Sequence, residues 1–178
     1  IKQIKKIKVA VLPLNFTGKK MDRVKELRQF TIRVYGILLD AARGVLVADE
    51  YQEGQSFTKF PGGGLQLGEG TRECLAREWM EELNQKIEVG DHFYTTDFYQ
   101  QSAFDPNKQV ISIYYLVHPL NNVESNPAIL SANDPNKSDA TAIFRWISVH
   151  EFNEELLTFP IDRLVGKMIK DQLLKITV

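Results

Sequence analysis

The sequence predicts a single α/β domain, a sandwich of strands and helices, and three observations support this fold class. Short runs rich in β-branched and aromatic residues recur along most of the chain, separated by turn residues. One strongly patterned helix lies among these strands, and a further helix is expected near the C-terminus. The 178 residues suit one domain with a sizeable core, and no linker-like segment divides them.

The strands are predicted from their apolar, β-branched and aromatic content. In chain order they are Gln29–Leu39, Val45–Ala48, Phe57–Phe60, Ile87–Gln101, Gln109–His118 and Ala142–Ile147. Asp40–Gly44 is expected to be a turn, and Tyr51–Ser56 a polar loop. Pro61–Gly64 is expected to end any regular element, because proline lacks a ladder donor and glycine permits positive φ. Turn chemistry at Asp105–Lys108 predicts a hairpin.

Helices are expected over Thr71–Leu83, His150–Leu157 and Ile161–Leu174, the last beginning just after Pro160. The polar segment from Pro119 to Asp139 is expected to be a long loop, and loops of this length are often functional. Residues 1–27, with their basic and apolar alternation, are predicted to be an arm or peripheral strand. The domain itself is expected to span residues 28–178.

Composition excludes several functional classes. Lys and Arg total 22 against 23 Asp and Glu, so no strong field attracts nucleic acid or an acidic membrane. The single cysteine, Cys74, excludes an internal disulfide and a cysteine-only zinc site, and it is expected to serve packing. No apolar run approaches the roughly 20 residues needed to span a bilayer. We therefore expect a cytoplasmic protein with no nucleic-acid or membrane partner, and a homodimer is left open.

The predicted helix at 71–83 has two contrasting faces when its residues are spaced at 100°. The apolar face comprises Leu75, Ala76, Trp79, Met80 and Leu83. The opposite face carries Glu78, Glu81 and Glu82, which are close enough to share one site. Like charges at this spacing destabilise a helix by about 0.2–0.5 kcal/mol per pair, whereas a hard divalent cation would favour them. A solvated acidic face is the plain alternative.

The residues that flank this helix favour a built site. Gly62, Gly63 and Gly64 allow a tight backbone turn whose carbonyls can approach a ligand or metal, although a flexible turn is the alternative. Arg77 is spaced to pair with acidic residues on the loop and helix, and bidentate pairing would tie the two together. Each feature alone has a plain alternative, but the joint spacing of the glycines, the arginine and the carboxylates indicates a built site.

This spacing resembles the Nudix box. Gly63 is followed after five residues by Glu69, and after seven more by Arg77-Glu78-Trp79-x-Glu81-Glu82. Asn84 stands where the box usually has glycine, and Gln85 where it has an aliphatic residue. Asparagine is the next choice for a left-handed helix cap, so Asn84 is expected to end the helix and Ile87 to dock after it.

The resemblance implies an α/β/α sandwich with a mixed β-sheet in a single domain. It also implies hydrolysis of the diphosphate linkage of a nucleoside diphosphate joined to another moiety, such as a nucleoside triphosphate or a nucleotide sugar. The implied cofactor is Mg²⁺ or Mn²⁺, and the implied partner is a small-molecule nucleotide. By the same resemblance Glu78, Glu81 and Glu82 would be catalytic metal ligands together with the Gly62 carbonyl. Gly63, Glu69 and Arg77 would support the box structurally.

Other site residues follow from weaker signals. The general base of the family is a box glutamate or a carboxylate on a late loop, and Asp139 lies where such a loop carboxylate is expected. Arg33, Lys59 and Tyr99 are candidates for substrate binding, with a solvated or core role as the alternative for each. The competing function is a non-catalytic nucleotide-binding sensor that uses the same pocket. The complete set of box carboxylates favours the enzyme.

Overall fold

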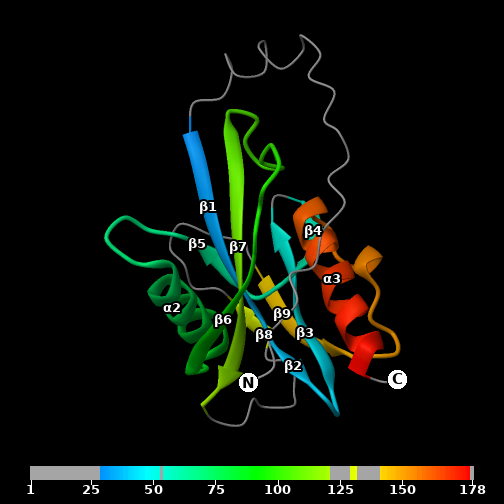
Figure 1. Cartoon of the computed structure of the whole chain (residues 1–178). Helices are drawn as coiled ribbons and strands as arrows, with labels where there is room; N and C mark the ends of the chain where they lie inside the picture. The colour runs from blue at the N-terminus through cyan, green and yellow to red at the C-terminus, as the bar shows by residue number, and fades with distance from the viewer. Residues whose placement is uncertain (1–28, 53, 121–128, 132–140, 177–178) are drawn as a thin grey trace, which may run out of the picture.

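The structure, a computed structural model, describes residues 29–52, 54–120, 129–131 and 141–176. Its strands form two sheets, and the helices α2 (Thr71–Leu83) and α3 (Pro160–Ile176) lie on opposite sides of them (Figure 1). One sheet has the order β5-β1-β7-β6. The other has the order β2-β3-β9-β8, with β4 paired to β3. The predicted α/β sandwich is therefore confirmed.

The first sheet is mixed, as expected. Its strands are β1 (Gln29–Ile37), β5 (Gly62–Gly64), β6 (Ile87–Thr95) and β7 (Lys108–Pro119). Strand β1 runs parallel to β7, with Arg33 opposite Ser112, and antiparallel to β5, with Arg33 opposite Gly64. Strands β6 and β7 form the predicted antiparallel hairpin. Because β1 is central, it places Arg33 between the glycine loop and the inner face of β7.

The second sheet is antiparallel within the described residues. Its strands are β2 (Leu39–Asp40), β3 (Gly44–Gln52), β4 (Gln55–Lys59), β8 (Ile129–Ser131) and β9 (Thr141–Ile147). Strand β3 pairs with β4 through a tight hairpin in which Ala48 faces Lys59. This register brings Lys59, at the end of β4, next to the start of the glycine loop.

Alternation along the strands divides the core into two layers, one under each helix. On β1, Val34 packs toward α2, while its neighbour Tyr35 packs toward α3. Leu46 and Val47 divide in the same way on β3. Successive side chains of a strand point to opposite faces, so strands covered by helices on both sides read as nearly continuous apolar runs.

Helix α2 has the predicted bounds, but its buried face is rotated from the one expected. Met80 is 38% exposed, whereas Cys74 and Glu78 are buried. The reason is that β5 covers the carboxylate side of the helix, so part of the predicted polar face lies against the protein. Asn84 ends the helix in the left-handed conformation, at φ 48° and ψ 36°, and Ile87 packs in the core beyond it, both as expected.

Several predicted element bounds were wrong. Pro61–Gly64 does not end regular structure, because Gly62–Gly64 pairs with β1 as β5. The loop expected at Tyr51–Ser56 is mostly strand, since cross-strand pairing continues almost to the turn. The helix expected at His150–Leu157 is only a 3₁₀ turn at Glu154–Leu156, capped by Asn153. Within the segment expected to be one long loop, Ile129–Ser131 forms β8.

The predicted N-terminal arm at 1–27 and the remainder of the 119–139 segment beyond Leu120 and β8 lie outside the described residues. Among the residues that the structure describes, no helix is both long enough and apolar enough to cross a membrane.

Candidate active site

The glycine loop is shaped by close backbone and side-chain packing. Gly62 has φ of 133°, and a Cβ there would lie 2.2 Å from the carbonyl oxygen of Val34. A Cβ on Gly63 would lie 2.2 Å from Oε2 of Glu78. At Gly62 only glycine fits, because of the positive φ and the backbone of Val34, whereas a side chain at Gly63 would force the carboxylate of Glu78 to move. The loop and the carboxylate face of α2 are therefore in direct contact.

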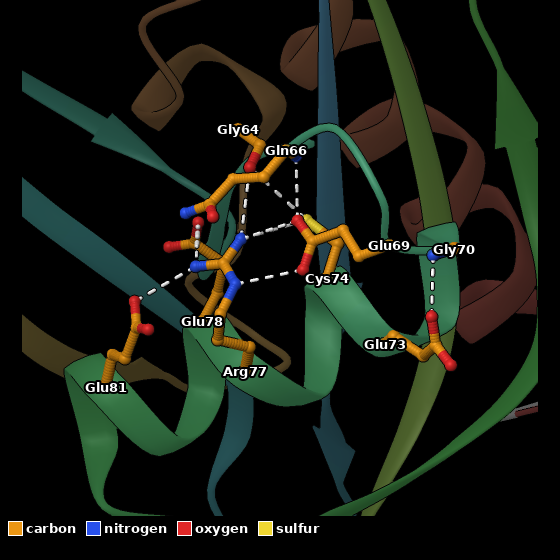
Figure 2. Close-up of polar contacts among 9 residues, drawn as sticks. All are labelled: Gly64, Gln66, Glu69, Gly70, Glu73, Cys74, Arg77, Glu78 and Glu81. Atoms are coloured by element: carbon orange, nitrogen blue, oxygen red, sulfur yellow. Dashed lines mark hydrogen bonds and ion pairs between the residues drawn. The ribbon is translucent and has the colours of Figure 1, made fainter.

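Arg77 ties this loop to the helix (Figure 2). Its Nε and Nη2 donate to the two carboxylate oxygens of Glu69 at 3.0 and 2.8 Å, a bidentate pair. Nη2 also donates to the carbonyl of Gly64 at 3.2 Å. The hydrogen bonds from Arg77 lower the pKa of Glu69 to about 2. Glu69 and Arg77 thus hold the glycine loop against the first turns of α2.

The same guanidinium reaches two of the three predicted carboxylate ligands of the metal. Nη1 of Arg77 lies 3.0 Å from Oε1 of Glu78 and 3.0 Å from Oε2 of Glu81. Glu78 is buried, Glu81 is exposed and Glu82 is partly buried. Across the described residues, no three His, Cys, Asp or Glu side chains form a ready-made metal cluster. Arg77 therefore bridges Glu78 and Glu81, and because it also pairs with Glu69, its single positive charge only partly offsets these three carboxylates.

The donor set at this place nevertheless fits a hard divalent cation. Three carboxylates from one helical face and backbone carbonyls from an adjoining glycine loop are oxygen ligands, which Mg²⁺ and Mn²⁺ prefer. Because Gly63 has no side chain, the carboxylate of Glu78 packs directly against the glycine loop that carries those carbonyls. Glu78, Glu81, Glu82 and the Gly62 carbonyl are thus the residues that would hold the metal.

A cavity of about 310 Å³ opens beside this site. Its walls come from β1, β3, β4, β7, the β6–β7 connection and the start of α3. Arg33 and Lys59, both predicted as substrate-binding residues, line it. Tyr99, the third predicted residue, is 39% exposed and is not part of the lining. Asp139, the predicted loop carboxylate, lies outside the described residues.

Lys59 links the cavity to the glycine loop. Its Nζ donates to the carbonyl oxygen of Gly62 at 2.6 Å and lies 2.7 Å from Oε1 of Glu50. Burial disfavours the charge, but the carboxylates of Glu50 and Glu82 and the Tyr35 hydroxyl outweigh it, so the pKa of Lys59 is raised. Nearby, Nε of Arg33 donates to the hydroxyl of Tyr35 at 2.9 Å. Two cations therefore face the cavity where it approaches the box.

The cavity is also lined by a buried acid, Asp162, that sequence reasoning missed. The hydroxyl of Tyr114 donates to Oδ1 of Asp162 at 2.6 Å. Asp162 is 1% exposed, and its Oδ2 finds no hydrogen-bond partner among the described residues. Burial raises the pKa of Asp162 to about 7. An aspartate in the first turn of a helix is an ordinary sequence feature, so no local signal distinguished it.

Three aromatic rings border the same cavity. Phe57, Phe104 and Phe159 contact one another with centroid distances of 5.3 to 6.0 Å.

Glu50, which also lines the cavity, was not predicted from the sequence, because a single acid near the end of a strand is usually solvated. The cavity lining thus combines cations and carboxyl groups with apolar rings, and among its carboxyl groups Asp162 is the one that is almost fully buried.

Comparison with known proteins assigns the family. The sequence matches the NUDIX domain over residues 29–167. The chain therefore belongs to the Nudix hydrolase family, and its domain is that of hydrolases of phosphoanhydride bonds. No curated protein matches the chain closely enough to add to this assignment.

Solved structures share the fold at low sequence identity. The chain is 18% identical to the ORF135 protein of E. coli, with a TM-score of 0.57 over 78% of this chain and 87% of that one. It is 19% identical to a MutT protein from Methanosarcina mazei Go1, with a TM-score of 0.59 over 82% and 96%. It is 15% identical to a NUDIX hydrolase from Nitrosomonas europaea, with a TM-score of 0.57 over 77% and 86%. At these identities the likeness establishes the fold.

Proposed function

We propose that this protein is a Mg²⁺- or Mn²⁺-dependent pyrophosphohydrolase. It cleaves the diphosphate linkage of a nucleoside diphosphate joined to another moiety, as in a nucleoside triphosphate or a nucleotide sugar. One observation carries the proposal: Lys59 lines the cavity and donates to Gly62 in the glycine loop. A substrate in the cavity would therefore have its phosphates beside the box carboxylates.

The roles of the residues follow from their positions. When bound, the metal supplies neutralisation of phosphate charge and lowers the pKa of a coordinated water. Glu78, Glu81 and Glu82 hold it, while Arg77 and Glu69 keep the loop and helix in register. Arg33 and Lys59 line the cavity and would orient the diphosphate, Arg33 through its charge and Lys59, whose charge is balanced by Glu50, as a hydrogen-bond donor, since in-line displacement depends mainly on positioning and charge.

The cavity suits the nucleoside part of such a substrate. Its volume of about 310 Å³ is at the small end of ligand sites. The rings of Phe57, Phe104 and Phe159 offer flat apolar surface, and Oδ2 of Asp162 offers a polar group to the edge of a base. Both features favour a heterocyclic base over a purely anionic group.

The general base is proposed to be a box glutamate or Asp139. Changing Asp139→Asn distinguishes the two, because a lost proton acceptor lowers kcat with little change in KM. If Asp139 only shapes a turn, the variant keeps its kcat and shows a lowered melting temperature. Steady-state kinetics and thermal unfolding of this one variant decide between these roles.

A substrate panel tests the function itself. Nucleoside triphosphates and nucleotide sugars are each incubated with the protein and Mg²⁺ or Mn²⁺, and release of nucleoside monophosphate is measured. We expect turnover of at least one compound, and no turnover when EDTA replaces the metal. Tight binding of a nucleotide without hydrolysis in either metal would contradict the proposal and identify the protein as a sensor.

A further inference from the structure

The ion pair between Glu50 and Lys59 is buried, although neither residue belongs to the Nudix box. Their side chains are 10% and 2% exposed, and Oε1 of Glu50 lies 2.7 Å from Nζ of Lys59. Glu50 comes from β3 and Lys59 from β4, two strands joined by a hairpin. A buried ion pair of this kind loses most of its hydration and seldom adds to stability, so its presence calls for another explanation.

The pair lies at the carbonyl that is proposed to bind the metal. Nζ of Lys59 donates to the carbonyl oxygen of Gly62 at 2.6 Å. A carbonyl oxygen has two lone pairs, so an ammonium and a metal can share it. An unbalanced ammonium in that position would repel a divalent cation.

We propose that Glu50 and Lys59 act as a neutral positioning pair for the metal site. Lys59 fixes the Gly62 carbonyl, and Glu50 cancels the charge of the ammonium, so that the fixed carbonyl can accept a divalent cation. This inference rests on the proposed function, because it takes Gly62, Glu78, Glu81 and Glu82 as the metal ligands. It assigns to Glu50 an electrostatic role at a distance from the metal.

A charge-balancing role for Glu50 and Lys59 predicts a different pattern of metal affinities from a purely structural role. Removing Glu50 leaves a net positive charge beside the carbonyl and weakens metal binding. Removing Lys59 leaves a net negative charge and tightens metal binding, because the loss of charge repulsion outweighs the loss of the hydrogen bond to the Gly62 carbonyl. Removing both restores the neutral state, so the double variant binds the metal more tightly than the Glu50 variant alone. If the pair served only to hold the strands in place, each single change would weaken binding, and the double change would weaken it about as much as either single change, because the first change already breaks the pair.

The experiment measures binding of Mn²⁺ alone by electron paramagnetic resonance at pH 8, without substrate. The variants are Glu50→Gln, Lys59→Met and the double variant, with thermal unfolding recorded for each. We expect the Kd for Mn²⁺ to rise by about tenfold in Glu50→Gln and to fall by about threefold in Lys59→Met. The double variant should lie within about threefold of the unaltered protein.

A neighbouring residue provides the matched control. Asp49 precedes Glu50 on β3 and pairs instead with Arg145 on β9 and with the hydroxyl of Thr58. Asp49→Asn removes one acid from the same strand, and its Kd should stay within about twofold, since alternate residues of a strand face opposite sides. A loss equal to that of Glu50→Gln would show an effect of net charge and overturn the inference.

The outcomes separate this inference from the proposed function. If the unaltered protein does not bind Mn²⁺, both fail. If it binds Mn²⁺ and Glu82→Gln weakens binding, but Lys59→Met also weakens it, only the charge-balancing role fails. Should Glu50→Gln not fold, the sign of the change in Lys59→Met still decides.

Discussion

Asp162 shows how a single buried side chain can matter for both substrate and stability. Its carboxyl lines the cavity and accepts a hydrogen bond from the hydroxyl of Tyr114, and the residue is 1% exposed. Burial raises its pKa from 3.8 to about 7, so the acid is mostly neutral in the folded protein below that pH. In the unfolded chain the same group ionises near its ordinary pKa.

This difference predicts a pH-dependent stability. The folded state holds a proton that the unfolded state releases between pH 4 and 7, so the contribution of Asp162 to the free energy of unfolding is lost as pH rises through that range. Relative to Asp162→Asn, the unaltered protein should lose on the order of 1–3 kcal/mol between pH 4 and 8. Urea unfolding of both proteins at several pH values checks this. Parallel curves would show that Asp162 titrates normally.

At the scale of elements, helix α2 depends on the cap that replaces the usual glycine of the box. Asn84 has φ of 48° and ψ of 36°, and its backbone N–H donates to the carbonyl of Met80 at 3.1 Å. Asparagine adopts this conformation at lower cost than other residues with a Cβ. The helix therefore ends where the box predicts, and the carboxylates keep their spacing.

Substitutions at the cap should separate conformation from chemistry. Asn84→Ala should lower the free energy of unfolding by about 1 kcal/mol, because alanine pays the left-handed penalty. Asn84→Gly should match the unaltered protein or exceed it slightly. Chemical denaturation of the two variants measures the difference. Equal losses in both would mean that the asparagine side chain, rather than its backbone conformation, stabilises the helix end.

The elements also show what the sequence can and cannot predict. Helix α2 and its cap could be predicted because the spacing of apolar residues and the preference of asparagine for the left-handed backbone conformation are local properties of the sequence. The strand at Gly62–Gly64 was not, since three glycines carry no strand propensity and pair with β1 only because the fold brings β1 alongside. The role of Asp162 depends on Tyr114, 48 residues earlier in the chain, and that of Glu50 on Lys59 across the β3–β4 hairpin, and neither contact follows from a local sequence pattern.

At the scale of the whole molecule, the two helices cover opposite sides of the strands (Figure 1). Helix α2 supplies the carboxylates, and the start of α3 supplies Asp162 to the cavity. Lys59 contacts the glycine loop and lines the cavity, so it joins the two parts. This arrangement favours hydrolysis of the phosphate linkage beside α2 and recognition of the nucleoside part of the substrate beside α3.

The most direct test compares hydrolysis by the unaltered protein and by Glu82→Gln on the best compound of the substrate panel. With saturating Mg²⁺, we expect release of nucleoside monophosphate to fall by orders of magnitude in the variant, because the metal loses a ligand. The melting temperature should be nearly unchanged, since the neutral amide also relieves repulsion among the glutamates. A near-normal rate of hydrolysis in Glu82→Gln would contradict the assignment of the box carboxylates as the metal site.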